Sequence, residues 1–170
     1  RLRCDWSSDV CSSDLSKNRS LLHRINQVSF FDGFSHIEKG KLLEKVEMFK
    51  KYEKKGLTIF SEGAKGESMY VVLEGVIGIT RLTFKRPKEK RVTLAKLKKG
   101  SVFGEISLLT NQNRTTGAIT DSSLVIVMVI DKKTLESFDL GIQKLFHTQM
   151  ISTLIRRLDG MNEKYRDVID

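Results

Sequence analysis

Several residue types are scarce in this sequence, and their scarcity limits what the chain can be. Its 170 residues include two cysteines, one tryptophan and one proline. The longest wholly apolar run, Leu124 to Ile130, is much shorter than the roughly 20 apolar residues that a membrane-spanning helix requires. We therefore expect no transmembrane segment in this sequence.

The first fifteen residues, RLRCDWSSDVCSSDL, differ from the rest in composition. Their last eleven resemble the translation of a sequencing adapter, and the segment has no apolar periodicity. We interpret residues 1–15 as non-native, the alternative being a native arm rich in serine and aspartate. Both cysteines, Cys4 and Cys11, lie in it, so the remainder has no disulfide framework and no thiolate chemistry. The natural N-terminus, and any upstream domain or signal peptide, stays undefined.

The remaining residues are basic. Residues 1–15 contribute −1 to the net charge of +9, so residues 16–170 carry +10. Such a charge favours acidic partners, nucleic acid or an anionic membrane surface. Because the lysines are spread along the chain, we prefer the simpler interpretation of a solvated basic surface. The segment from Lys85 to Arg91, which contains the only proline, predicts a solvated hairpin tip rather than a nucleic-acid patch.

The residue patterns of common enzymes and metal sites are missing. His23, His36 and His147 are scattered, and no Cys/His spacing suits a metal ion. The phosphate-binding pattern G-x-x-x-x-G-K-[ST] and the nucleophile pattern G-x-S-x-G are both absent. We therefore expect no metal site, and we expect that the chain is not an enzyme.

The secondary-structure signals indicate a mainly β domain with flanking helices. Ser35 and Glu38 have the spacing of a capping box, which predicts a short helix to about Val46. Short apolar segments separated by glycine or polar turns then predict an antiparallel sandwich or roll. The predicted strands are 48–52, 58–60, 68–73, 76–83, 91–97, 118–120 and 124–130. Positive φ angles are expected at Gly56, Gly63, Gly66, Gly75 and Gly100.

Two helices are predicted after the strands. Asp131 suits the N-cap of a helix that reaches Phe138, and a longer helix is expected over 141–169. The first part of the long helix has one apolar face suited to docking on the roll. Its second part carries an a/d pattern of apolar residues, made of Ile151, Leu154, Leu158, Met161, Tyr165 and Val168.

The most informative segment runs from Phe103 to Thr116 with the sequence FGEISLLTNQNRTT. A glycine followed by a helix start allows an anion to approach free backbone N–H groups. The planar guanidinium of Arg114 suits two phosphate oxygens, whereas the ionised carboxylate of Glu105 requires a donor such as a hydroxyl. A ligand with a phosphate beside a free sugar hydroxyl meets these requirements, and a 3′,5′-cyclic nucleotide is such a ligand.

This segment resembles the phosphate-binding cassette of the cyclic nucleotide-binding domain family, which includes the catabolite activator protein and the regulatory subunits of protein kinase A. The resemblance extends from about Phe30 to Phe138. It rests on several further matches in the same order, namely Phe31-Asp32-Gly33-Phe34, Ile59-Phe60-Ser61-Glu62-Gly63, Met69-Tyr70-Val71-Val72-Leu73-Glu74-Gly75 and Gly100. It implies an antiparallel β-roll of the double-stranded jelly-roll type with a short N-terminal helix and a long C-terminal helix.

The resemblance also implies a cytoplasmic regulatory module of signal transduction that binds cAMP or cGMP. The implied ligand-binding residues are Phe103, Gly104, Glu105, Ile106, Ser107, Arg114, Thr115, Thr116, Met161 and Asn162. Thr115 resembles a residue that favours guanine in cGMP-dependent kinases, but cAMP is expected from its frequency in the family. Asn113 stands where many members have proline, and the branched Thr116 stands where they have a small residue.

The resemblance divides the chain into a β-roll with its N-terminal helix, residues 16–138, and a lid and dimerisation helix, residues 139–170. A possible homodimer through Ile151–Val168 is implied, with a monomer as the alternative. Two other functions stay open. One is a fragment of a catabolite-activator-type transcription factor. Such factors carry a helix-turn-helix after the long helix, whereas no helix-turn-helix or other DNA-binding segment is present before Asp170. The other is a ligand-free interaction domain of the same fold.

Overall fold

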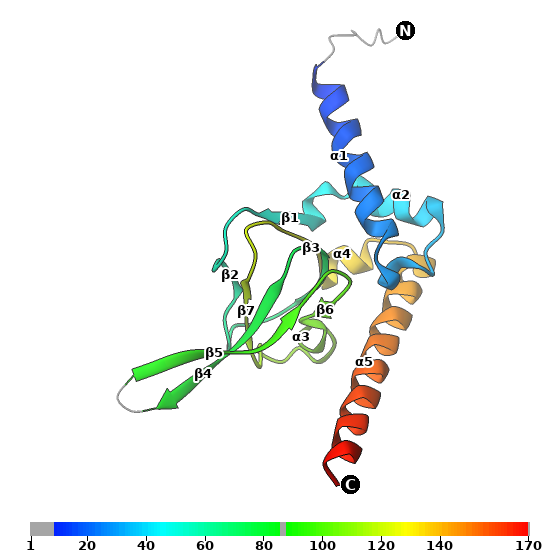
Figure 1. Ribbon diagram of the computed structural model, residues 1–170. Coiled ribbons are helices and arrows are strands. Elements are labelled where there is room, and N and C mark those ends of the chain that lie inside the picture. The colour runs from blue at the N-terminus through cyan, green and yellow to red at the C-terminus, as the bar shows by residue number, and fades with distance from the viewer. Residues whose placement is uncertain (1–8, 86–87, 170) are drawn as a thin grey trace, which may run out of the picture.

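The computed structural model describes residues 9–85 and 88–169, which form two antiparallel four-stranded sheets with helices around them (Figure 1). The strand order is β1-β8-β3-β6 in the first sheet and β2-β7-β4-β5 in the second. The strands are β1 (Phe49–Tyr52), β2 (Thr58–Phe60), β3 (Ser68–Glu74), β4 (Ile77–Lys85), β5 (Lys88–Leu97), β6 (Val102–Phe103), β7 (Gly117–Thr120) and β8 (Val125–Asp131). This arrangement confirms the antiparallel β-roll predicted from the sequence.

Strand β3 is covered on both faces, which explains why residues 69–73 form a continuous apolar run. Neighbouring side chains of a strand point to opposite faces of the sheet. Met69, Val71 and Leu73 are buried in the core beneath the helices. Tyr70 and Val72 lie in a second cluster with residues of both sheets. The strand is thus covered on both faces, which removes the apolar/polar alternation of a half-exposed strand.

The helices are α1 (Asp9–Asn26), α2 (His36–Glu44), α3 (Glu105–Thr110), α4 (Lys132–Glu136) and α5 (Leu140–Ile169). The predicted capping box of α2 is confirmed, since the Glu38 N–H donates to Ser35 Oγ over 3.3 Å and the Ser35 N–H donates to Glu38 Oε2 over 2.7 Å. Asp131 is the N-cap of α4, as expected. Helix α1 includes residues on both sides of position 15. The non-native origin of residues 1–15 stays a prediction.

Four details differ from the sequence-based predictions. Helix α1 was not predicted. Strand β6 was not expected, because two residues show no periodicity and the strand exists only through its pairing with β3. Gly66 does not have a positive φ angle, whereas Gly104 does. The hairpin of β4 and β5 continues to Lys85 and Lys88, so its strands are longer than predicted, and its tip at residues 86–87 lies outside the described residues.

Helix α5 changes its environment along its length. Ile142, Phe146 and Met150 are buried, and Phe146 contacts the aromatic rings of Phe30 and Phe34 from the segment between α1 and α2. Beyond Met150 the helix exposes a stripe of Ile151, Ile155, Leu158 and Met161, each more than half exposed. Figure 1 shows that the C-terminal end of α5 extends away from α1 and α2.

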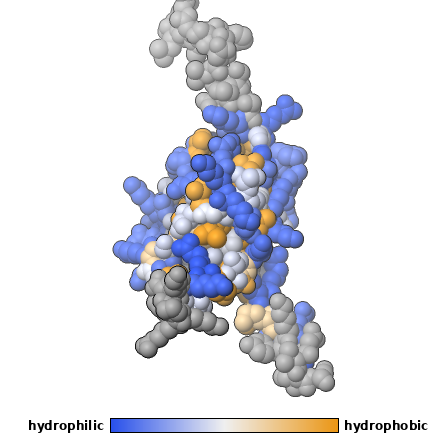
Figure 2. All heavy atoms as spheres, turned by 60° about the vertical axis from the view of Figure 1, so that its left-hand side comes forward, coloured by the Kyte–Doolittle hydropathy of each residue, from blue (hydrophilic) through white to orange (hydrophobic). Residues whose placement is uncertain are grey.

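One face of the molecule is mostly hydrophilic (Figure 2). Figure 2 shows that hydrophilic side chains dominate one face of the molecule and that hydrophobic residues form small separate patches on it. Within residues 9–85 and 88–169, no helix is long and apolar enough to cross a membrane.

Candidate functional site

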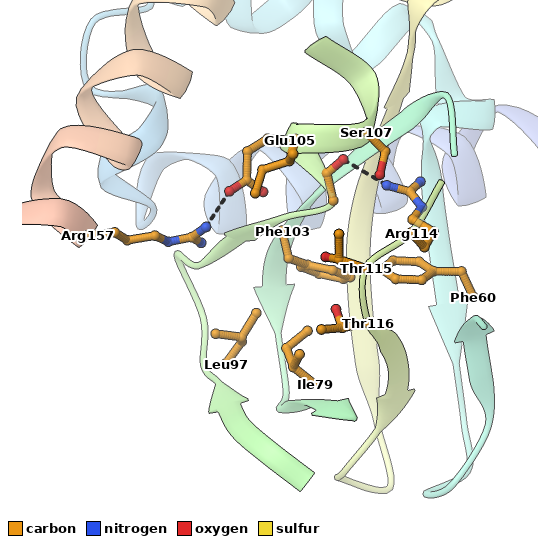
Figure 3. A pocket seen from close by; sticks show the side chains of 12 residues that line it. Phe60, Ile79, Leu97, Phe103, Glu105, Ser107, Arg114, Thr115, Thr116 and Arg157 are labelled. Carbon is orange, nitrogen blue, oxygen red and sulfur yellow. Dashed lines mark hydrogen bonds and ion pairs between the residues drawn. The ribbon is translucent and has the colours of Figure 1, made fainter. Parts of the chain in front are cut away.

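The cassette residues line one cavity of about 170 Å³ beside α3 (Figure 3). Eight of the ten predicted ligand-binding residues are among its lining residues, namely Phe103, Gly104, Glu105, Ile106, Ser107, Arg114, Thr115 and Thr116. Met161 and Asn162 do not line it and are exposed on α5. The structure therefore brings the cassette together, while a role for Met161 and Asn162 stays a prediction.

Gly104 allows the cassette to turn sharply at the start of α3. Its φ angle is +76°, in the left-handed region that favours glycine. A Cβ atom at this position would lie 2.6 Å from Arg114 Nη1 and 3.1 Å from the Ser68 carbonyl oxygen. Gly104 is therefore required both by the backbone conformation and by the close approach of the Arg114 guanidinium.

The Arg114 side chain is 5% exposed and is held from several sides. Nη1 donates to the Gly104 carbonyl over 2.7 Å, and Nη2 donates to the Ser68 carbonyl over 2.6 Å. The guanidinium lies 4.3 Å from the ring centroid of Phe60 and 5.6 Å from that of Tyr70, within the range of cation–π attraction. These contacts fix the guanidinium at the edge of the cavity.

This cation has unused hydrogen-bonding capacity. A guanidinium has five N–H donors, and Nε is buried without a partner among the described residues. Burial lowers the pKa of Arg114 from its usual value, and the neighbouring Tyr70 partly opposes that change. A buried unpartnered donor on a cation is costly, so the arrangement favours an anionic ligand with several acceptor oxygens.

Gly66 completes the surroundings of Arg114. An ideal Cβ at Gly66 would lie 2.4 Å from Arg114 Nε and 2.7 Å from Cζ, closer than any real contact. The glycine is therefore needed for the space that the guanidinium occupies and not for a left-handed backbone. Sequence reasoning assigned the wrong cause because the neighbour of Gly66 comes from a distant part of the chain.

Glu105 is paired with a residue that the sequence did not single out for the site. Its carboxylate is 2% exposed and accepts a hydrogen bond from Arg157 Nη1 of α5 (Figure 3). Arg157 Nη2 also donates to the Val102 carbonyl. The Arg157 side chain is 41% exposed and lines the cavity. No sequence pattern placed Arg157 at the site, because Glu105 lies 52 positions away along the chain.

The remaining wall of the cavity is apolar. It is formed by Phe60, Ile79, Leu97 and Phe103, with Thr116 next to Ile79 (Figure 3). Phe103 is stacked on Tyr70 with centroids 4.9 Å apart and planes inclined by 15°. The cavity thus combines a cation, a carboxylate and an apolar wall. Among the described residues, no group of three or more His, Cys, Asp or Glu is placed to hold a metal ion.

Comparison with known families and proteins agrees with this geometry. The family model described as cyclic nucleotide-binding domain matches residues 50–139. The global nitrogen regulator of Synechococcus elongatus is 34% identical over 87 residues, which are 51% of this chain and 36% of that protein. The CRP-like cAMP-activated global transcriptional regulator of Mycobacterium tuberculosis is 28% identical, over 68% of this chain and 49% of that protein. The chain thus spans less than half the length of these curated relatives.

Solved structures share the fold. The regulatory domain of Toxoplasma gondii PKA with cAMP has a TM-score of 0.59 and 23% identity, covering 81% of this chain and 51% of that one. The Thermus thermophilus catabolite activator protein has a TM-score of 0.60 and 22% identity, covering 82% of this chain and 62% of that one. At these identities the likeness concerns the fold.

Proposed function

Because the chain belongs to the cyclic nucleotide-binding domain family, we propose that the cavity beside α3 binds a 3′,5′-cyclic nucleotide, cAMP in preference to cGMP, and that residues 16–170 act as a cytoplasmic regulatory module rather than an enzyme. The observation that carries this proposal is a buried guanidinium with an unpartnered donor and a buried carboxylate in one cavity. Residues 16–138 are the binding roll and residues 139–170 are the lid and dimerisation helix.

Each part of the ligand has a partner in this arrangement. The cyclic phosphate accepts hydrogen bonds from Arg114 and from the backbone N–H groups of Ile106 and Ser107. The ribose 2′-hydroxyl donates to Glu105, which as an ionised carboxylate only accepts. The base lies against the apolar wall, and Met161 and Asn162 contact it only if the end of α5 closes over the cavity.

Isothermal titration calorimetry of the whole chain with cAMP and with cGMP tests this function. We expect saturable binding of cAMP, with cGMP weaker. Absence of heat from either nucleotide at millimolar concentration would exclude the proposal in favour of a ligand-free interaction domain. Sequencing the longer open reading frame distinguishes a stand-alone module from a fragment of a transcription factor, because the latter has a helix-turn-helix after α5.

The cavity must widen before it holds a nucleotide. Its volume of about 170 Å³ is below the roughly 300–1,000 Å³ that is typical of small-molecule sites. Arg157 is a cavity-lining side chain that is partly solvated and carried by a helix that ends away from the roll. We infer that the ribose hydroxyl takes the place of Arg157 at Glu105, which releases this part of α5.

Base choice gives a first prediction. Thr115 lines the cavity, and its hydroxyl is a donor and an acceptor that suits the amino group of guanine. We expect Thr115→Ala to weaken cGMP binding several-fold and to leave cAMP binding within about twofold, because loss of one neutral hydrogen bond costs about 0.5–1.5 kcal/mol. Competition titrations measure both constants. A wild-type preference for cGMP would reverse the choice of ligand.

Dimerisation gives a second prediction. Of the expected seam, Ile151, Leu158 and Met161 are exposed on α5 and Leu154 is partly buried, while the side chains of Tyr165 and Val168 lie outside the description. We propose that two copies pair along Ile151–Val168. Leu154→Asp with Leu158→Asp is then expected to convert the dimer to monomers in sedimentation at tens of micromolar. A wild-type monomer both with and without nucleotide, or a dimer that the double substitution leaves unchanged, would rule out this interface.

A further inference from the structure

A second concave surface is lined by residues of α1 and β1. These two elements lie at the end of the roll away from α3 (Figure 1). This groove has a volume of about 490 Å³ and shares no lining residue with the cassette cavity. Its lining residues are Lys17, Ser20, Leu21, Arg24, Val46, Phe49, Lys50, Lys51 and Ile126. We refer to these residues as the α1–β1 groove.

The floor of the α1–β1 groove is apolar. Phe49 and Leu21 are partly buried against the main core, and Ile126 is buried in it. Val46 is 54% exposed although it is aliphatic. The register of β1 with β8 places Phe49 opposite Met128 and Lys51 opposite Ile126, so these side chains share one face of the sheet. The helices leave this end of the face accessible, and apolar surface left open beside polar residues is typical of binding sites.

The rim of the groove is basic, and none of its lining residues is acidic. Arg24 Nε lies 2.6 Å from Glu74 Oε2, and Lys51 Nζ lies 2.5 Å from Glu53 Oε1. Lys17 and Lys50 have no ion pair with any side chain that the structure describes. The groove therefore has an apolar floor, and its lining includes four basic residues and no acidic one.

We propose that the α1–β1 groove binds an acidic amphipathic helix of a partner protein. The apolar side of such a helix covers Val46, Leu21 and Phe49, and its carboxylates face Lys17 of α1 and Lys51, which shares the sheet face of Phe49. A recessed groove between a helix and a strand accepts a convex helix, which is a common way of recognising peptides. A flat bilayer does not reach the floor of a groove of this kind. Charge complementarity selects acidic over basic partners.

A designed peptide tests the proposal with the full chain. The probe is a fluorescein-labelled 18-residue peptide with leucine at every third or fourth position and glutamate or alanine elsewhere, and its control has lysine in place of each glutamate. Fluorescence anisotropy at physiological salt is expected to give a dissociation constant on the order of 1–100 µM for the acidic peptide. The basic peptide is expected not to bind.

Two matched charge reversals locate the site. Lys17→Glu with Lys51→Glu is expected to weaken peptide binding about tenfold or more, because two attractions become repulsions. Lys98→Glu with Lys144→Glu makes the same change in net charge at exposed positions outside the groove and is expected to change binding less than threefold. Val46→Asp, which removes part of the floor, is expected to act like the groove variant. Melting temperatures and cAMP titrations show that the variants are folded.

Other results would overturn the proposal. Absence of acidic peptide binding at several hundred micromolar would do so, as would equal weakening by the two charge reversals, which indicates unspecific attraction. Vesicles of phosphatidylserine and phosphatidylcholine are the third probe. Groove-dependent binding to these vesicles without peptide binding would assign the surface to anionic lipid instead.

Discussion

Arg114→Ala is expected to weaken cAMP binding by roughly ten- to a hundredfold or more. Hydrogen bonds that involve a charged group contribute about 1.5–3 kcal/mol each, and about 1.4 kcal/mol corresponds to a factor of ten in affinity. Calorimetry measures the loss directly. Arg114→Lys keeps the charge without the planar fork, so it is expected to recover only part of the affinity. Equal affinity of wild type and Arg114→Ala would remove Arg114 from the phosphate site.

A separate substitution tests the same position without changing Arg114. Gly66→Ala is expected to reduce cAMP affinity as well, because its Cβ would lie 2.4 Å from Arg114 Nε and would displace the guanidinium. Gly40→Ala is the matched control, since a Cβ there meets no atom within 4 Å and Gly40 lies in α2. Melting temperatures separate loss of the site from loss of the fold. Unchanged affinity in Gly66→Ala would contradict the assigned role of this glycine.

Arg157→Ala is expected to strengthen cAMP binding by about tenfold. In the ligand-free protein the substitution leaves the buried Glu105 carboxylate without its ion-pair partner. In the proposed complex the ribose hydroxyl would donate to the same carboxylate, so the substitution would cost less there. Since Arg157 is 41% exposed, solvent screening limits the difference to about 1.4 kcal/mol, near the lower end of the range for charged hydrogen bonds.

Arg156→Ala is the control for this effect. Arg156 is the exposed neighbour on α5, and among the described residues its side chain donates only to the Ser152 carbonyl of its own helix. We expect the Arg156→Ala variant to bind cAMP with the affinity of wild type. Without ligand, the Arg157→Ala variant is expected to melt at a lower temperature than wild type or Arg156→Ala. Weaker cAMP binding by Arg157→Ala would show instead that Arg157 contacts the bound nucleotide.

The two arginines have different roles in the proposed mechanism. Arg114 is held by backbone carbonyls and aromatic rings, so it would supply a fixed positive charge for the phosphate. Arg157 is carried by α5 and connects that helix to Glu105. Exchange of Arg157 for the ribose hydroxyl would therefore couple occupancy of the cavity to the position of α5, whose exposed apolar stripe is the proposed dimer contact.

The local elements of the fold could be read from neighbouring residues. The capping box of Ser35 and Glu38 and the N-cap Asp131 depend on contacts within one helical turn, which the residue order specifies directly. The strands were recognised because apolar segments end at glycines with positive φ angles, such as Gly75 and Gly100. The eight cassette residues could be predicted together because they lie close in the sequence, in two short runs that include the start of α3 and the segment that follows it.

Contacts between distant segments could not be read in this way. Gly66 is a glycine because Arg114 occupies the space beside it, and Glu105 is paired because α5 brings Arg157 to it from 52 positions away. The α1–β1 groove joins Lys17 to Val46 and Ile126, which no spacing along the chain connects. The order of residues along the chain was sufficient to predict the turns, the helix caps and the cassette. The packing of α5 and α1 on the roll decided which side chains share a cavity, because burial and charge pairing depend on distances in space.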